Sequence, residues 1–89
     1  MRLAKSEQLI LILLAELGPS YGLQLVTASR GRVKRGGVYV TLGRMEDKNL
    51  VASAEGESGR RLYRPTGLGE RALLAARVFA GQLQVEAKA

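Results

Sequence analysis

The sequence predicts a mainly α-helical fold that carries one small β-wing. Residues 37–48 follow a helical period, with an apolar back and a basic front. Directly after them, residues 51–55 and 60–64 have the character of two short strands, joined by the turn residues Gly56-Glu57-Ser58-Gly59. Two helical segments precede this unit and a longer one follows it. This order of elements indicates a winged helix-turn-helix with a C-terminal dimerisation helix.

The first helix is predicted to surround the apolar run of residues 9–15, with Ser6 as its N-cap and Gly18-Pro19 as its stop. The run is far too short to span a bilayer, and no signal-peptide cleavage site follows it. A helix that is apolar all round is buried on several sides, and in so small a domain one side is expected to meet a second subunit. Leu11 and Leu14 are therefore predicted to lie in a dimer interface.

Ser20 is predicted to cap a second helix that covers residues 21–29. The residues of this helix that are expected to face inward are Leu23, Val26 and Thr27. Tyr21 has two interpretations at this stage. It is either an aromatic residue in the core or at its rim, or a residue that contacts a phosphate of a nucleic acid. The second interpretation rests on its place at a helix N-terminus, where free N–H groups attract anions.

The segment from Arg30 to Gly37 is the predicted turn between the two helices of the motif. It holds four cations and no anions in a glycine-rich sequence. Such a segment can be merely solvated and flexible. The segment lies directly before the helix predicted over residues 37–48, whose basic side can enter a DNA groove. This position favours contacts of Lys34 and Arg35 with a DNA phosphate or with the edge of the groove.

Residues 37–48 are predicted to form a helix with one apolar side and one basic side. Its apolar stripe is expected to consist of Val38, Leu42, Met45 and Asn49. The opposite, solvent-facing side is expected to carry Thr41, Arg44 and Lys48, beside the small Gly43. A helix with an apolar back, a basic front and little bulk can enter a DNA major groove.

Base-edge contacts are predicted for Thr41 and Arg44, because they lie on the exposed N-terminal half of this helix. Arginine reads guanine bidentately, and threonine can hydrogen-bond a base or touch a thymine methyl. Lys48, one turn further on, is expected to meet a phosphate. Tyr39 is expected to pack its ring at the flank of the core and to turn its hydroxyl toward a phosphate.

The return strand of the predicted two-stranded wing is rich in arginine. Arg60 and Arg61 lie where the loop re-enters the sheet, and Arg64 follows further along the strand. These side chains are expected to enter an adjacent minor groove or to hold its phosphates, the alternative being a plain solvated edge. Glu46 is expected to play a structural part by pairing with Arg64 or Arg61.

Thr66 is predicted to cap the last helix, which begins at Gly67 or Leu68 and ends near residue 85. Two apolar stripes run along this helix, and one of them can cover its own domain. The other is expected to pack against a partner's helix in a two-fold dimer. The residues assigned to that interface are Leu74, Val78, Gly81 and Val85. Residues 1–66 are thus the predicted DNA-binding domain and residues 67–89 the dimerisation helix, in one compact unit.

Composition narrows the classes of function. The chain has 89 residues, of which 46% are hydrophobic and four are aromatic, which suits one small domain with an aliphatic core. It has no Cys and no His, which excludes disulfides, zinc fingers and the usual nucleophile–base pairs. No enzymatic activity, cofactor or metal is predicted. Residues 30–64 carry +5 of the net charge of +6, which indicates a polyanionic partner or an anionic surface.

Four pieces of the sequence, in this order and spacing, resemble the core signature of PadR-type transcriptional regulators. They are Pro19 to Leu25, Gly37 to Glu46, Asn49 to Val51, and Arg60 to Thr66 with the following Gly69. Three positions depart from the family pattern: Val40 stands where proline is usual, Asn49 where glycine is usual, and Pro65 where an aliphatic residue is usual. Asparagine tolerates the left-handed conformation that ends a helix, and Pro65 indicates the end or the edge of a strand.

The resulting prediction is a sequence-specific regulator that binds duplex DNA, a repressor that acts as a homodimer in the cytoplasm with the nucleoid. The resemblance implies dimerisation through the C-terminal segment. It also implies a possible small aromatic effector, for which the chain offers Phe79 and three tyrosines but no polar cluster. One alternative is a winged-helix protein-interaction module without specific DNA binding. Another is RNA binding, for which Tyr63 is the one aromatic residue expected on the sheet.

Overall fold

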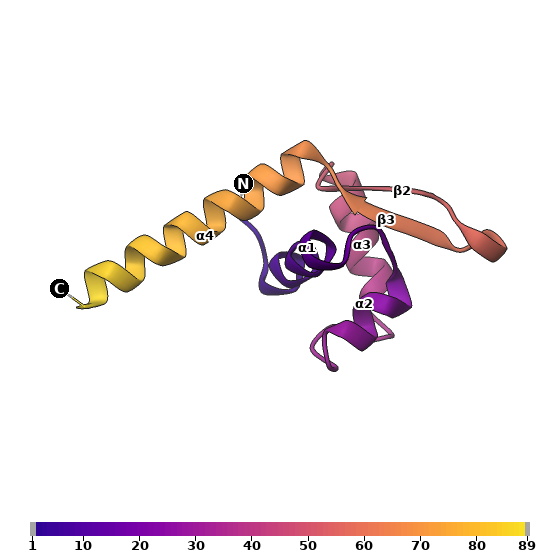
Figure 1. Cartoon of the computed structure of the whole chain (residues 1–89), viewed down its shortest axis with the longest axis horizontal. Helices are drawn as coiled ribbons and strands as arrows, with labels where there is room; N and C mark the ends of the chain where they lie inside the picture. The colour runs from indigo at the N-terminus through magenta and orange to yellow at the C-terminus, as the bar shows by residue number, and fades with distance from the viewer. Residues whose placement is uncertain (1, 89) are drawn as a thin grey trace.

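The structure is a computed structural model, which describes the backbone of residues 2–88 and the side chains of residues 2–78. Its elements in chain order are α1 (Lys5–Leu17), β1 (Ser20–Tyr21), α2 (Gly22–Ala28), α3 (Val38–Asp47), β2 (Val51–Glu55), the short helix η1 (Glu57–Gly59), β3 (Arg61–Pro65) and α4 (Gly67–Lys88). The wing formed by β2 and β3 leaves the body on one side, and α4 projects from it on the other (Figure 1). The predicted mainly helical winged helix-turn-helix is confirmed.

One aliphatic core lies among α1, α2, α3, the sheet and the first turns of α4. Its fully buried side chains are Ile10, Leu11, Leu14, Leu25, Val38, Leu42, Met45, Leu50 and Val51. The three predicted apolar residues of α3 are among them. Asn49 is not, because it follows the helix and is exposed, with a φ of 64°. That left-handed conformation ends the helical stretch, as expected of asparagine at this place.

The inward face of α2 differs from the prediction. Leu25 is fully buried and Val26 is partly buried against the core as predicted, whereas Leu23 and Thr27 are exposed. A helix of seven residues is too short for a helical period to stand out among neighbouring apolar residues. The packing of α2 against α1 and α3 therefore decides which side chain points inward.

The start of α1 also differs from the prediction. The N-cap is Ala4 and not Ser6. The backbone N–H of Ala4 donates to Oε1 of Glu7 at 2.9 Å, so that a side chain from the first turn closes the end of the helix.

The sheet has three antiparallel strands in the order β1-β3-β2, one strand more than predicted. The additional strand β1 consists of Ser20 and Tyr21, which pair with Tyr63 and Leu62 of β3. Ser20 is therefore a strand residue and not the cap of α2, and its hydroxyl donates to the carbonyl oxygen of Gly18 at 2.8 Å. A strand of two residues has no alternation that a sequence could show.

The two longer strands lie close to their predicted bounds. β2 covers residues 51–55 as predicted, and β3 is shifted by one residue, to residues 61–65. Pro65 pairs with Val51 at the very end of β3, beyond the stretch that β1 flanks. The missing N–H of Pro65 is tolerated there because β3 has a neighbour on one side only.

Thr66 caps α4 as predicted, because its Oγ1 accepts the backbone N–H of Gly69 at 3.0 Å. The same hydroxyl donates to the carbonyl oxygen of Asn49 at 2.6 Å, which ties α4 to the turn after α3. Gly69 lies so close to the backbone carbonyl of Leu50 that an added Cβ would overlap it. No helix in the described part of the chain is long and apolar enough to cross a membrane.

Two residues assigned to the dimer interface belong to the core of this domain instead. Leu11 and Leu14 are each 1% exposed. The first turns of α4, including the buried Leu73, help to cover this side of α1. These two leucines therefore leave almost no surface for the predicted contact with a second subunit.

Candidate nucleic-acid interface

The helix α3 is anchored on one side and free on the other. Val38, Leu42 and Met45 are fully buried, and at about 100° per residue the opposite side holds Val40 and Asp47. The prediction put Thr41 on the solvent side, but Thr41 is half-buried at the flank.

Val40, which was not predicted as a contact, is 56% exposed. Arg44 is exposed as predicted, and in the described part of the chain no carboxylate lies within 4 Å of it.

Lys48 is already paired within the protein. Its Nζ lies 2.8 Å from Oε2 of Glu7, a buried carboxylate on α1. Burial alone would raise the pKa of Glu7, but the hydrogen bonds from Lys48 and from the N–H of Ala4, with the charges of Lys48 and Arg44, outweigh it. The pKa of Glu7 therefore lies below its ordinary value, and Lys48 fixes the end of α3 to α1.

The loop between α2 and α3 has an internal anchor. Val33 is buried, and its backbone N–H donates to Oγ of Ser29 at 2.9 Å. The Ser29 hydroxyl in turn donates to the carbonyl oxygen of Val26 at 2.8 Å. This anchor leaves Lys34 and Arg35 exposed directly before the first turn of α3. The loop therefore presents its cations at a defined place, although the sequence alone allowed a flexible segment.

Two tyrosines lie where α2 begins. The ring of Tyr39 lies over the backbone of Gly22, where an added Cβ would be 2.7 Å from its Cε1 atom. About half of the Tyr39 side chain is exposed, so the ring is packed on one side only, as predicted. Tyr21 turns the other way, toward the tip of the wing. Its hydroxyl accepts the backbone N–H of Glu57 at 3.1 Å.

Arg60 at the wing tip stacks on Tyr21, with its Cζ 4.2 Å from the centroid of the ring. Gly56 makes the close approach possible, because an added Cβ there would be 2.6 Å from the Tyr21 hydroxyl oxygen. Tyr21 is thus the rim aromatic that the sequence allowed, and it supports the wing.

Arg61 is held by Ser53 on the neighbouring strand. The Nε and Nη2 atoms of Arg61 donate to Oγ of Ser53 at 3.1 and 2.9 Å, and Ser53 donates to Oε2 of Glu46 at 2.9 Å. The predicted direct pairing of Glu46 with Arg61 or Arg64 is therefore replaced by a relay through a hydroxyl. Burial, followed by the charge of Glu46, raises the pKa of the neighbouring Tyr63. Arg64 is exposed on β3.

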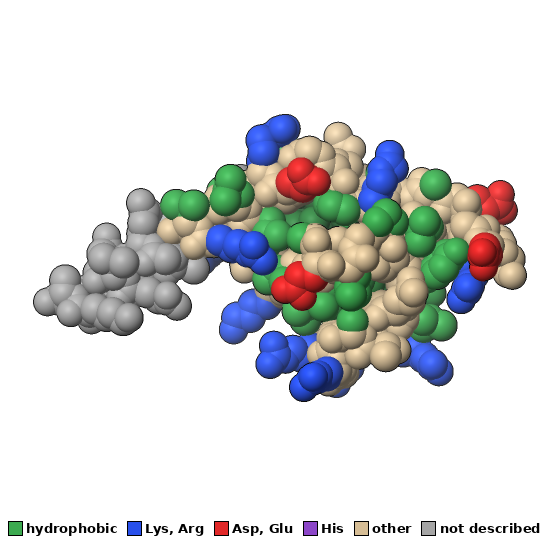
Figure 2. Space-filling view, in the orientation of Figure 1, with side chains coloured by type: hydrophobic (Ala, Val, Ile, Leu, Met, Phe, Trp, Pro, Cys, Tyr) green, Lys and Arg blue, Asp and Glu red, His purple; other side chains and the backbone are tan. Residues whose placement is uncertain are grey.

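Cations border the body of the molecule, and the wing tip has mixed charge. Figure 2 shows lysine and arginine side chains along the lower edge of the body, around the place of α2 in Figure 1, and carboxylates at the tip of the wing. The acidic residues of the wing are Glu55 and Glu57. The helix-turn-helix therefore carries exposed cations, and the wing adds arginines, of which Arg60 is held by Tyr21 and Arg61 by Ser53.

An exposed helix beside an ordered basic loop and an arginine-bearing wing is the arrangement of a DNA-binding winged helix. Residues 10–75 match the family described as "Transcriptional regulator PadR-like family". The chain belongs to this family. Membership implies DNA binding, confirms the resemblance found in the sequence, and places the protein among regulators and not among enzymes.

Solved structures share the fold of this PadR-like protein. RosR from H. salinarum is 24% identical with a TM-score of 0.75, over 88% of this chain and 74% of that chain. A PadR family transcription regulator from Clostridium difficile R20291 is 24% identical with a TM-score of 0.69, over 93% and 98% of the two chains. A transcriptional regulator from Clostridium thermocellum is 25% identical with a TM-score of 0.71, over 92% and 89%. A search of curated proteins gave no match.

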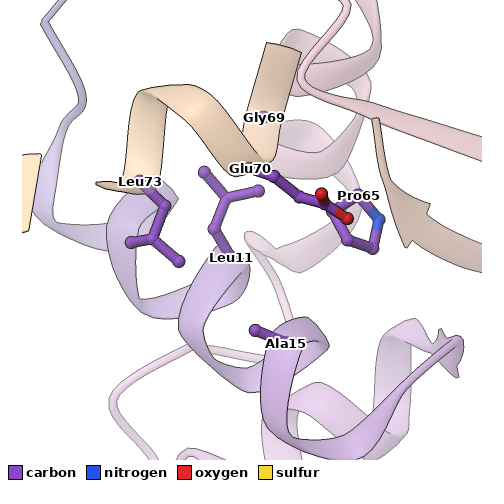
Figure 3. A pocket seen from close by; sticks show the side chains of 6 residues that line it. All are labelled: Leu11, Ala15, Pro65, Gly69, Glu70 and Leu73. Atoms are coloured by element: carbon purple, nitrogen blue, oxygen red, sulfur yellow. The ribbon is translucent and has the colours of Figure 1, made fainter. Parts of the chain in front are cut away.

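The PadR-like protein has a hollow of about 190 Å³ between α1 and the start of α4 (Figure 3). Its lining residues are Leu11, Ala15, Pro65, Gly69, Glu70 and Leu73. Pockets that take small molecules measure roughly 300–1,000 Å³, and this wall is apolar apart from the carboxylate of Glu70. The hollow gives no support to the aromatic effector that the resemblance implies.

The outer face of α4 in this PadR-like protein carries two of the residues assigned to the dimer interface. Leu74 is 63% exposed and Val78 is 53% exposed. Gly81 and Val85, also assigned to that interface, lie outside the residues whose side chains the structure describes. The two exposed residues are four positions apart, which is about one helical turn, so they lie on the same side of α4. The helix itself projects from the body (Figure 1).

Proposed function

We propose that the protein is a transcriptional repressor that binds duplex DNA as a homodimer and reads sequence with α3. The observation that carries this proposal is the one-sided anchoring of α3, whose buried residues leave the side with Arg44 free. The N-terminal half of α3 lies in the major groove, with Thr41 and Arg44 at base edges. Asp47, at the other end of the exposed side, repels phosphates and so favours entry by the N-terminal half.

Phosphate contacts supply most of the affinity in this proposal. Lys34 and Arg35 are exposed beside the first turn of α3, which supports contacts to the strand that borders the groove. The half-exposed Tyr39 belongs to the first turn of α3 and has its hydroxyl beside Gly22, at the start of α2. Lys48 contributes less, because its charge is already balanced by Glu7. Tyr21 acts by positioning the wing and not by touching DNA.

The wing contacts the adjacent minor groove or its phosphates in the same complex. Arg60 and Arg61 are each fixed by a neighbouring side chain before DNA arrives, so less conformational entropy is lost when they bind. Arg64 is exposed further along the strand. The carboxylates at the wing tip limit the number of phosphates that the wing can approach.

Dimerisation through α4 completes the proposal. Leu74 and Val78 are exposed apolar side chains on a helix that leaves the body, and a second copy of α4 covers them in a two-fold dimer. Gly81 and Val85 continue the same sequence pattern. Two reading helices, one from each subunit, then meet half-sites about one helical turn apart.

Fluorescence anisotropy on a labelled random duplex, at a series of salt concentrations, tests this function. We expect tight binding at low salt and a linear fall of log affinity with log salt, by about one unit of slope for each contacted phosphate. Replacing Lys34 and Arg35 by alanine should lower the slope by about two. Replacing the exposed Arg71 and Arg77 of α4 by alanine is the matched control and should leave the slope unchanged. Absence of duplex binding at low salt contradicts the proposal.

A further inference from the structure

Val40 is the most exposed of the large apolar side chains on α3, and the described residues leave more than half of it open to solvent. It is 56% exposed and lies opposite the buried stripe that contains Val38 and Leu42. A β-branched residue at an exposed helix position gains no burial and is a slightly poorer helix former than a straight-chain residue. The packing of this domain therefore gives no reason for a valine at this position.

Gly43 lies about one turn after Val40 on α3, and the packing of the domain does not explain this residue either. A glycine inside a helix costs about 1 kcal/mol of stability relative to alanine. At Gly69 a close backbone contact explains the glycine, but an added Cβ at Gly43 would have no neighbouring heavy atom within 4 Å. The chain itself has room for a side chain at this position. A molecule outside the chain that comes close to the helix here would explain the bare backbone.

We propose that Val40 and Gly43 form a shallow apolar notch that receives the C5-methyl group of a thymine, beside the base pair contacted by Arg44. This inference rests on the proposed function. Val40 precedes Gly43 by three residues and Arg44 by four, so the three residues are neighbours on the helix surface. The thymine methyl is the apolar group that base edges present in the major groove. The bare backbone of Gly43 lets the helix approach until the short Val40 side chain touches it.

The surroundings of the notch favour DNA over an apolar protein partner. The exposed Arg44 borders it on the helix, and the exposed Lys34 and Arg35 precede the same helix. A stable protein–protein interface covers roughly 800 Å² on each partner, which is far more than one valine and one glycine offer. A small apolar notch among cations suits a methyl group on a polyanion.

Deoxyuridine tests the notch directly, because it pairs like thymine and lacks only the methyl group. A preferred duplex is first selected from a random pool with the wild-type protein, and each thymine is then replaced singly by deoxyuridine. At one thymine position in each half-site we expect the affinity of the wild type to fall roughly four-fold, the value of one buried methyl group. Val40→Ala should bind the thymine and the deoxyuridine duplex equally. Leu23→Ala, which shortens an exposed apolar side chain on α2, should keep the wild-type difference.

Gly43→Ala provides a second and independent measurement. The substitution should raise the melting temperature of the free protein by several degrees, because alanine is the better helix former and has room. The same substitution should weaken binding to preferred and random duplexes by roughly ten-fold or more, because the added methyl group holds the helix away from the bases.

The outcomes separate the notch from the proposed function. Tight wild-type binding to the selected duplex with no thymine position sensitive to deoxyuridine, or with the same sensitivity in Val40→Ala, overturns the notch and leaves the proposed function in place. Wild-type affinity in Gly43→Ala overturns the close approach at that glycine. A wild-type protein that binds no duplex overturns both the proposed function and the notch.

Discussion

Tyr21 lies beneath the guanidinium group of Arg60, with 4.2 Å between the ring centroid and Cζ. The hydroxyl of the same tyrosine accepts the N–H of Glu57. A residue at the start of α2 thus holds the tip of a wing that lies more than thirty residues later in the chain. The position of the wing relative to the helix-turn-helix is fixed by this contact, in addition to the pairing of β1 with β3.

Removal of the Tyr21 ring should loosen the wing. We expect Tyr21→Leu to weaken duplex binding several-fold and to lower the free energy of unfolding by about 1 kcal/mol, since it removes a cation–π contact and a hydrogen bond. Tyr21→Phe keeps the ring and loses only the hydroxyl, so its affinity and stability should lie between those of the wild type and of Tyr21→Leu. Anisotropy and urea denaturation measure the two quantities. Equal binding by wild type and Tyr21→Leu would show that the wing needs no such support.

Glu7 should make the stability of the protein depend on pH. Its pKa is lowered in the folded state, so it stabilises the fold above its ordinary pKa of 4.5, and this contribution is lost as the pH falls through the lower, folded-state value. We expect Glu7→Gln to lower the free energy of unfolding by about 1–2 kcal/mol at neutral pH, because Lys48 at the other end of the pair is partly solvated.

Urea denaturation at neutral pH and at about pH 3 measures this effect. The difference between wild type and Glu7→Gln should shrink at the acidic pH. Glu16→Gln, which changes an exposed carboxylate on the same helix, is the matched control and should show little difference at either pH. A Glu7→Gln difference of the same size at both pH values would mean that shape, and not charge, matters at this position.

Arg44 and the wing arginines should affect binding in different ways. Arg44→Ala should cost about 1–3 kcal/mol on the preferred duplex and relax the choice of base at one position. Replacing Arg60 and Arg61 together should weaken preferred and random duplexes alike and reduce the salt slope. Competition between the selected and the random duplex measures the ratio of the two affinities for each variant. If Arg44→Ala weakened both duplexes equally, Arg44 would be a phosphate contact and not a base-reading residue.

The outer face of α4 should control the oligomeric state. We expect Leu74→Glu combined with Val78→Glu to give a monomer, because two carboxylates at a two-fold interface meet their own copies without partners. Arg77→Glu changes an exposed residue of the same helix and should leave the dimer intact if the interface is limited to the apolar stripe. Light scattering after gel filtration measures the mass. A double variant with the same mass as the wild type would place the subunit interface elsewhere.

Much of the fold was predictable because its signals are local. The buried stripe of α3, the bounds of β2, the cap at Thr66 and the left-handed Asn49 each follow from residue types at fixed spacing. The features that were not predicted correctly are short elements or contacts between residues far apart in the chain. β1 has two residues, and α2 has seven, so neither shows a period. Leu11 and Leu14 looked available to a partner because a sequence does not show that the first turns of α4 pack against α1.

In the candidate site, too, the local features could be predicted and the contacts between distant residues could not. Exposed cations before α3 and on β3 were predicted from charge, whereas the contacts that hold them were not. Ser53 carries no signal that it would link Arg61 to Glu46, and Glu7 carries none that it would bind Lys48. Val40 could have been found on the helical wheel, because its angle is opposite the apolar stripe. Because valine is hydrophobic, its exposure on the surface was not expected.

The helices with long apolar periods, the wing, the basic middle segment and the family could be predicted from the sequence, because these features depend on residues close together in the chain. The three-dimensional packing was needed to show that Lys48 is neutralised by a carboxylate, which leucines form the core, and which side of α3 is exposed. These properties depend on distances between residues far apart in the chain. Packing sets such distances, because a side chain is buried or paired only when another element comes to lie against it.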